Sequence, residues 1–140
     1  MYVPFIIFHW HTNDMNGKRI ITGYKQGGHS MDKRYMALGT SMLVLRLLEQ
    51  ESMYGYQIIR ELEQQSRNVF QLQEGTLYPI LHNLEEQGAV SSYRQTADSG
   101  RIRKYYAITP TGRLLLEEKA REWEIYQTAV NQVMGGVVFG

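Results

Sequence analysis

Apolar residues recur at helical spacing through the central part of the chain. Four of them follow one another at intervals of four and three, as on an amphipathic helix with one buried face: Leu38, Met42, Leu45 and Leu48. The period breaks at residues 54–56 and then resumes, to about Gln65, in three more: Ile58, Ile59 and Leu62. The pattern therefore predicts two helices joined by a tight corner.

A third apolar stripe predicts a helix that begins near Gly75 or Thr76. Proline lacks an amide hydrogen, so Pro79 is expected in the first turn, where that hydrogen would have no partner. Gly88 is a natural stop, and residues 68–72 before the helix are expected to form a short strand or a linker. The stripe itself consists of four residues: Leu77, Ile80, Leu81 and Leu84. Three short helices with these corners are typical of a helix-turn-helix.

Two segments that favour β-structure follow, at residues 90–94 and 103–109, and the turn-forming residues 96–100 separate them. They predict a β-hairpin with a polar tip. Alternation gives the second strand one face that can be buried and one that carries charge: Tyr106 and Ile108 on the first, Arg103 and Tyr105 on the second.

A long helix is predicted from Thr109-Pro110 to about Met134, before Gly135-Gly136. Roughly 25 residues give about 37 Å, more than one small domain needs to cover its core. Six residues form a heptad-like seam along it: Leu116, Ala120, Trp123, Gln127, Val130 and Met134. The seam predicts a homodimer; alternatively it packs against the first helix, and both can hold along different parts of its length.

The first 30 residues lack this regularity, and we expect them to form a poorly ordered leader. Gln26-Gly27-Gly28 can be encoded by a ribosome-binding type of sequence, so one hypothesis is that translation starts at Met31; chance occurrence of the tripeptide is the alternative. The expected organisation is a winged-helix domain at residues 31–109, a dimerisation helix at residues 110–134 and a tail at residues 135–140.

The composition fits one globular domain: the chain has 140 residues, 43% of them hydrophobic. It has no cysteine, which excludes disulfides, thiolate metal sites and thiol nucleophiles. The apolar stretch from Val3 to Phe8 is too short to span a membrane and lacks the flanks of a secretory signal. We expect a cytoplasmic protein without a membrane partner.

The sequence shows no convergent set of reactive groups of the kind that an enzyme needs. His82 is the only histidine in the region expected to be ordered, and the acidic residues lie at i, i+4 spacing from bases on exposed helix faces. His9-Trp10-His11 lacks a third ligand and is a weak metal motif. We therefore expect no catalytic residues, no metal and no cofactor.

The distribution of charge is more informative than the formal net charge of +1. Against the single acid Asp98, the hairpin region holds five bases: Arg94, Arg101, Arg103, Lys104 and Arg113. Such a patch can neutralise DNA phosphates, although an ordinary solvated hairpin is the alternative. The outward face of the third helix is short and polar: Pro79, His82, Asn83 and Glu86 lie on it, and Thr76 and Tyr78 flank it. Its Asn, His, Thr and Tyr side chains offer donors and acceptors for base edges or phosphates. Because Glu85 and Glu86 would repel phosphates, contacts are expected in its first two turns.

Over roughly residues 38–134, the chain strongly resembles the PadR family of bacterial transcriptional regulators. The motifs that carry the resemblance are Gly55-Tyr56-Gln57-Ile58, Gly75-Thr76-Leu77-Tyr78-Pro79-Ile80-Leu81-His82-Asn83-Leu84-Glu85, Gly100-Arg101-Ile102-Arg103-Lys104-Tyr105-Tyr106-Ala107-Ile108-Thr109 and Gly112. The resemblance implies a mainly α fold with a small β-hairpin, namely a winged helix-turn-helix plus a long C-terminal helix.

The resemblance also implies double-stranded DNA as partner, with the third helix in the major groove, the hairpin wing on the backbone or minor groove, and a dimer on a palindromic operator. The expected DNA contacts are Tyr54, Thr76, Tyr78, Pro79, His82, Asn83, Arg101, Arg103 and Lys104. Asn83 and Ile102 depart from the family pattern, which leaves the operator sequence open.

Trp123 lies in the middle of the seam, where multidrug-responsive members of the resembled family carry a tryptophan that contacts flat aromatic ligands. A packing role is the alternative. The expected function is that of a sequence-specific DNA-binding regulator, a repressor released by a small aromatic ligand. A protein-interaction module that uses the long helix without binding DNA is the second candidate.

Overall fold

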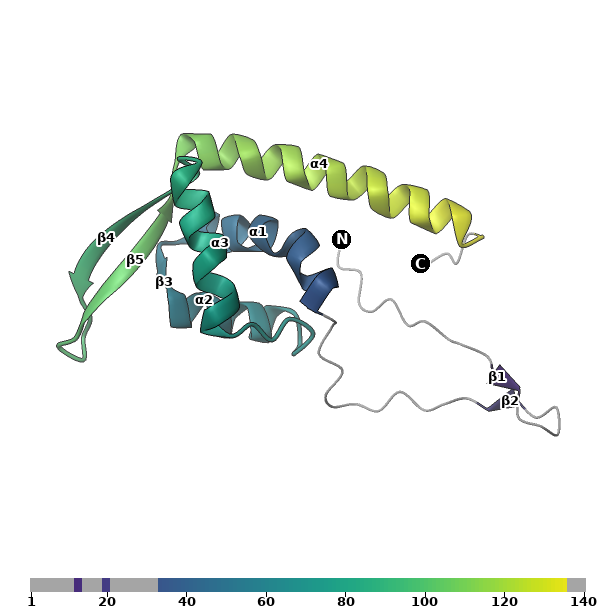
Figure 1. Ribbon diagram of the computed structural model, residues 1–140, viewed down its shortest axis with the longest axis horizontal. Helices are drawn as coiled ribbons and strands as arrows, with labels where there is room; N and C mark the ends of the chain where they lie inside the picture. The colour runs from purple at the N-terminus through teal and green to yellow at the C-terminus, as the bar shows by residue number, and fades with distance from the viewer. Residues whose placement is uncertain (1–11, 14–18, 21–32, 136–140) are drawn as a thin grey trace.

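The computed structural model describes residues 12–13, 19–20 and 33–135 (Figure 1). Its helices are α1 (Lys33–Gln50), α2 (Gly55–Gln65), α3 (Glu74–Glu86) and α4 (Pro110–Val133). An antiparallel sheet has the strand order β3 (Met53–Tyr54), β5 (Ile102–Ile108) and β4 (Val90–Thr96), and β1 (Thr12–Asn13) pairs separately with β2 (Arg19–Ile20). The predicted mainly helical fold with a small hairpin and a long last helix is confirmed.

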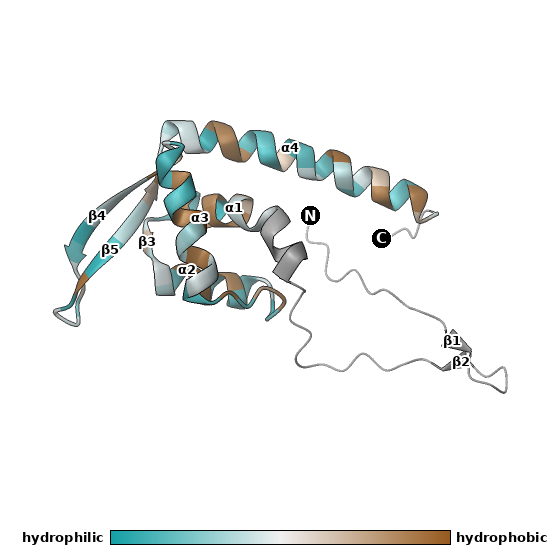
Figure 2. Cartoon of the chain, in the orientation of Figure 1, coloured by the Kyte–Doolittle hydropathy of each residue, from teal (hydrophilic) through white to brown (hydrophobic). Residues whose placement is uncertain are grey.

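The core lies between α1, α2 and α3, and the inner face of the sheet and the first turns of α4 close it. Leu45, Ile58, Leu77 and Leu81 are fully buried there, which accounts for the spacing of apolar residues in the three helices. Figure 2 shows that apolar residues continue along α4 far beyond the part that covers this core. Among the described residues, the core therefore takes side chains from α4 only near its beginning, at Leu115 and Leu116.

The corner between α1 and α2 is built differently from the expectation. The predicted break between the two helices is present but lies at residues 51–54: Met53 and Tyr54 form β3, opposite Tyr106 and Tyr105 of β5, and α2 already begins at Gly55. A strand of two residues shows no alternation, so its sequence gave no sign of it. The strand ties the start of α2 to the hairpin.

Pro79 was also placed wrongly, because α3 begins at Glu74 and Pro79 is therefore in its second turn. The amide that Pro79 lacks would have paired with the carbonyl of Gly75, which is exposed, so water can satisfy that oxygen. Glu74 favours the early start, since a carboxylate in the first turn interacts well with the helix dipole. Residues 70–73 before it form a linker.

The hairpin joins α4 through a tight junction. The Thr109 side chain caps α4: its Oγ1 accepts a hydrogen bond from the Gly112 amide at 3.0 Å and donates one to the Gly88 carbonyl. The Thr109 amide donates to the Ala89 carbonyl at 3.0 Å. These bonds fix the direction in which α4 leaves the domain.

The leader hypothesis concerns a segment of which the structure describes only β1 and β2. His9, Trp10, His11, Gln26 to Gly28 and Met31 lie outside the described residues, as do residues 136–140. The start at Met31 remains a hypothesis.

Candidate nucleic-acid interface

The outward face of α3 carries the side chains that the sequence predicted there. Tyr78, Pro79, His82 and Asn83 are exposed, and Thr76 is half-buried. His82 Nε2 lies 3.4 Å from Glu86 Oε1, one turn further along the helix. The face is thus accessible over its first three turns, with one acidic group beside His82 at its far end.

Tyr78 is held by the start of α2. An added Cβ at Gly55 would lie 2.8 Å from Tyr78 Oη, so glycine is what allows the ring to rest there. Burial raises the pKa of Tyr78, and the nearby Glu74 and then Tyr106 raise it further. The phenol therefore stays protonated at neutral pH and can donate a hydrogen bond.

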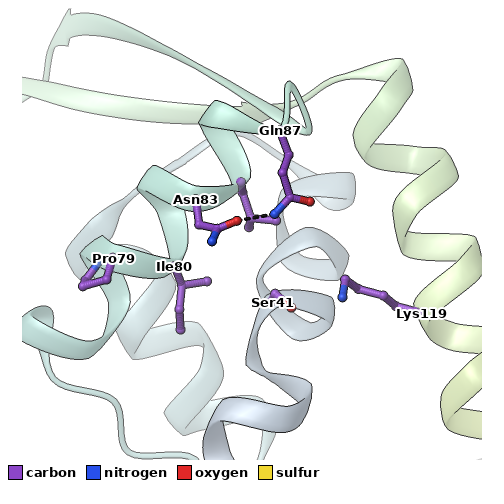
Figure 3. Close-up of a pocket in the computed structure, with 7 residues that line it drawn as sticks. Ser41, Pro79, Ile80, Asn83, Gln87 and Lys119 are labelled. Carbon is purple, nitrogen blue, oxygen red and sulfur yellow. Dashed lines mark hydrogen bonds between the residues drawn. The ribbon is translucent and has the colours of Figure 1, made fainter.

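Asn83 has a partner within its own helix. Its Oδ1 accepts a hydrogen bond from Gln87 Nε2, and Figure 3 shows both side chains at the rim of a pocket of about 430 Å³, with Lys119 of α4 opposite. A bidentate contact to adenine needs both the oxygen and the NH₂ group of an asparagine amide. In such a contact, the Oδ1 of Asn83 would either be shared between Gln87 and adenine or exchange one partner for the other, because an amide oxygen can accept two hydrogen bonds.

The basic residues of the hairpin region fall into distinct groups. Within residues 39–135, Arg94 and Arg101 are exposed and have no ion-pair partner. Arg113, in contrast, lies 3.6 Å from Glu49 of α1. The cations of the hairpin region that are freely available to phosphates are therefore Arg94 and Arg101.

Arg103 lies on the outer face of the sheet, in an aromatic cluster of Tyr54, Tyr93 and Tyr105. Its guanidinium is 4.2 Å from the centre of the Tyr54 ring, and its Nε is buried without a hydrogen-bond partner in the part of the chain that the structure describes. Tyr105 packs edge-on against Tyr54 at 5.5 Å and is stacked with Tyr93 at 5.7 Å. Two predicted DNA contacts, Tyr54 and Arg103, thus contact each other.

Lys104 points to the opposite face, toward α3. Its Nζ lies 3.7 Å from Glu85 Oε2 and 5.3 Å from the centre of the Tyr106 ring. Ser92 of β4 donates a hydrogen bond to the other carboxylate oxygen of Glu85. Both wing strands are therefore tied to one carboxylate of the third helix.

The predicted seam on α4 divides into two parts. Leu116 is buried in the core of its own chain, in line with the alternative that part of the stripe packs against α1. Gln127 and Val130 are half-buried, whereas Ala120, Trp123 and Met134 are exposed. The surface that remains open to another molecule begins after Leu116.

Trp123 borders a pocket of about 240 Å³ between α1 and α4. Its ring lies 5.9 Å from that of Tyr126, at a tilt of 33°. The remaining lining residues are Gly39, Met42, Lys119 and Glu122. The pocket thus combines aromatic rings with one cationic and one anionic group.

The chain matches a family model described as the transcriptional regulator PadR-like family over residues 44–118, more than half of its length. The chain belongs to this family. The match includes α2, α3, the hairpin and the first turns of α4, which are the elements that carry the motifs above. The recognition made from the sequence is therefore confirmed, and this PadR-like protein is a transcriptional regulator.

The relatives of this PadR-like regulator align with most of its chain. An uncharacterized protein of Lysinibacillus sphaericus is 34% identical over 95 residues, 68% of this chain and 87% of that protein. The transcriptional regulator Rv3488 of Mycobacterium tuberculosis is 32% identical over 104 residues, 74% of this chain and 91% of that protein. A PadR-like transcriptional regulator of Bacillus cereus has a similar crystal structure, with a TM-score of 0.65, 27% identity and coverage of 74% and 98%.

Two kinds of feature are absent from the described part of the PadR-like protein. Among the described residues, no helix is long and apolar enough to cross a membrane. No cluster of three or more potential metal ligands lies in the same part of the chain.

Sequence reasoning missed two features of the interface. The Tyr93–Tyr105 stack could have been inferred from the hairpin, because these residues are cross-strand partners once the register is known. The contact of Glu85 with both strands had no signal in the sequence, since it depends on how the hairpin folds back on α3. From the sequence, Glu85 indicates only repulsion of phosphates.

Proposed function

We propose that this PadR-like protein is a sequence-specific DNA-binding regulator that places α3 in the major groove and the wing on the phosphate backbone. One observation carries the proposal: the exposed polar face of α3 adjoins a hairpin whose Arg94 and Arg101 have no ion-pair partner within the described chain. A major groove admits one α-helix, and unpaired arginines release counterions when they meet phosphates.

In this proposal, the protein acts as a homodimer that forms through the part of α4 beyond Leu116. Trp123 and Met134 are 46% and 53% exposed, which is unusual for residues of this kind at heptad positions of a helix without a partner. Two-fold pairing would present two copies of α3 to half-sites about one DNA turn apart. The expected operator is therefore palindromic.

The regulator is proposed to be a repressor that a small aromatic ligand releases from DNA. The pocket beside Trp123 supports this role, because it lies between α1 and α4, where a bound ligand would change how α4 sits on the domain. Aromatic rings favour a flat ligand that can stack.

Replacing Arg101 by alanine is expected to lower the salt dependence of DNA binding by about one counterion, because one phosphate contact is lost. The measurement is binding to a duplex of random sequence at several salt concentrations. Arg113→Ala serves as the matched control, since Arg113 lies beside Glu49. Equal salt dependence for Arg101→Ala and the unmodified protein would show that the wing does not contact phosphates. Absence of DNA binding at any salt concentration would favour the protein-interaction module.

Binding of a planar aromatic compound is expected to quench the fluorescence of Trp123. In Trp10→Phe protein, which retains Trp123 as its single tryptophan, saturable quenching should persist; in Trp123→Phe protein it should be lost. The same compound should weaken binding to an operator selected from a random DNA pool. Quenching that depended on Trp10 instead would remove the pocket beside Trp123 from the proposal.

A further inference from the structure

We propose that Glu85 is a positioning residue that holds the wing against α3 and competes with DNA phosphates for Lys104, so that it restrains binding to non-operator DNA. The inference rests on the proposed function. It assigns to an acidic residue of the third helix a part in selectivity rather than simple repulsion of DNA.

The geometry around Glu85 is that of a bridge between two elements. One carboxylate oxygen accepts from Ser92 of β4, and the other lies 3.7 Å from the ammonium group of Lys104 in β5. The side chain of Glu85 is 33% exposed and that of Lys104 is 49% exposed. The carboxylate therefore contacts both strands of the wing at a site that solvent and DNA can still reach.

The ion pair is weak enough to be exchanged. Exposed pairs of this kind contribute little to stability, because water screens them. A phosphate that approached the wing would offer Lys104 a replacement anion. While Glu85 keeps its charge, however, each such exchange leaves a carboxylate near the phosphate, and the net gain from the Lys104 contact is reduced.

This reduction affects the two modes of DNA binding unequally. Binding to arbitrary DNA is almost entirely electrostatic, whereas operator binding also includes contacts with base edges. Operator binding can thus compensate for the exchange of Lys104 through contacts that α3 makes only there. Glu85 should lower affinity for arbitrary DNA by a larger factor than affinity for the operator.

The neighbouring acid provides a matched control. Glu86 is on the same helix, one residue further, and lies near His82 rather than near a wing residue. Glu85→Gln and Glu86→Gln remove the same charge from α3. Gln at position 85 still has an oxygen that can accept from Ser92, so the substitution removes the competition for Lys104 while it keeps the hydrogen bond.

The test is a double-mutant cycle of Glu85→Gln and Lys104→Met, with Glu86→Gln in both backgrounds. Methionine keeps an aliphatic side chain over the Tyr106 ring and removes the charge. Binding to a duplex of random sequence is measured at several salt concentrations, and thermal unfolding checks that each variant is folded. Operator affinity is measured in parallel on a selected site.

Glu85→Gln should raise affinity for random DNA by up to about tenfold at 0.1 M salt and steepen the salt dependence by up to about one counterion. The increase in affinity for random DNA should be larger for Glu85→Gln than for Glu86→Gln. In the Lys104→Met background this difference between the two variants should vanish. The ratio of operator to random affinity should fall.

Equal effects of Glu85→Gln and Glu86→Gln in both backgrounds would overturn the inference and leave the proposed function intact. Loss of random-DNA affinity in folded Glu85→Gln protein would overturn it as well. An unmodified protein that bound no DNA at any salt would overturn the proposed function, and the inference with it.

Discussion

Replacing Gly112 by alanine is expected to lower the free energy of unfolding by about 3 kcal/mol. An alanine Cβ at this position would lie 2.0 Å from the carbonyl oxygen of Ala89 and 2.8 Å from Ile108 Cγ1. The backbone around Ala89 cannot simply retreat, since the same carbonyl accepts the amide of Thr109. The substitution must therefore separate α4 from the hairpin or distort both.

The measurement is thermal or urea unfolding at one fixed protein concentration, because the apparent stability of an oligomer depends on concentration. A decrease in Tm of about 10 °C or more is expected for Gly112→Ala. Gly39→Ala is the control: Gly39 is in α1, nothing lies within 4 Å of an added Cβ, and alanine there should raise stability by about 0.5 to 1 kcal/mol. Similar results for both variants would contradict this account of the junction.

The spacing of apolar residues predicted the helices, because the burial of one helix face decides which positions are apolar. The spacing of Leu77, Leu81 and Leu84 on α3 follows from one face packed against α1 and α2, and any reading of that spacing gives a helix. The start of α3 was misplaced because Pro79 was given the usual position of a helical proline. Its true place depends on an exposed carbonyl at Gly75, which is a property of the folded chain.

Individual pairings within the candidate site could not be predicted in the same way. Arg103, Lys104 and Arg101 all looked like phosphate contacts in the sequence. In the structure, the alternation of β5 sends Arg103 to Tyr54 and Lys104 to Glu85, and Arg101 stays without an ion-pair partner among the described residues. These contacts join residues about 20 or more positions apart, and they require the register of the hairpin and its position on α3.

Replacing Trp123 by glutamate is expected to dissociate the proposed dimer and to reduce affinity for a selected operator by at least about 100-fold. A charge buried in a self-pairing surface meets its own copy, and it cannot shed water without a partner of opposite sign. A monomer then holds one half-site at a time and loses the gain from simultaneous contact with both. Because Trp123 is 46% exposed in the single chain, the domain itself should remain folded.

Ile125→Glu separates this effect from a general effect of charge on α4. Ile125 is 64% exposed and lies about 160° around the helix from Trp123, so the same substitution falls on the opposite face. Sedimentation should show a monomer for Trp123→Glu and a dimer for Ile125→Glu, and only the former should lose operator affinity. If Trp123→Glu stayed dimeric, or if both variants dissociated, the seam through Trp123 would be the wrong surface. The dimer would then have to form through another part of the molecule, and the pocket beside Trp123 would no longer be linked to the spacing of the two α3 helices.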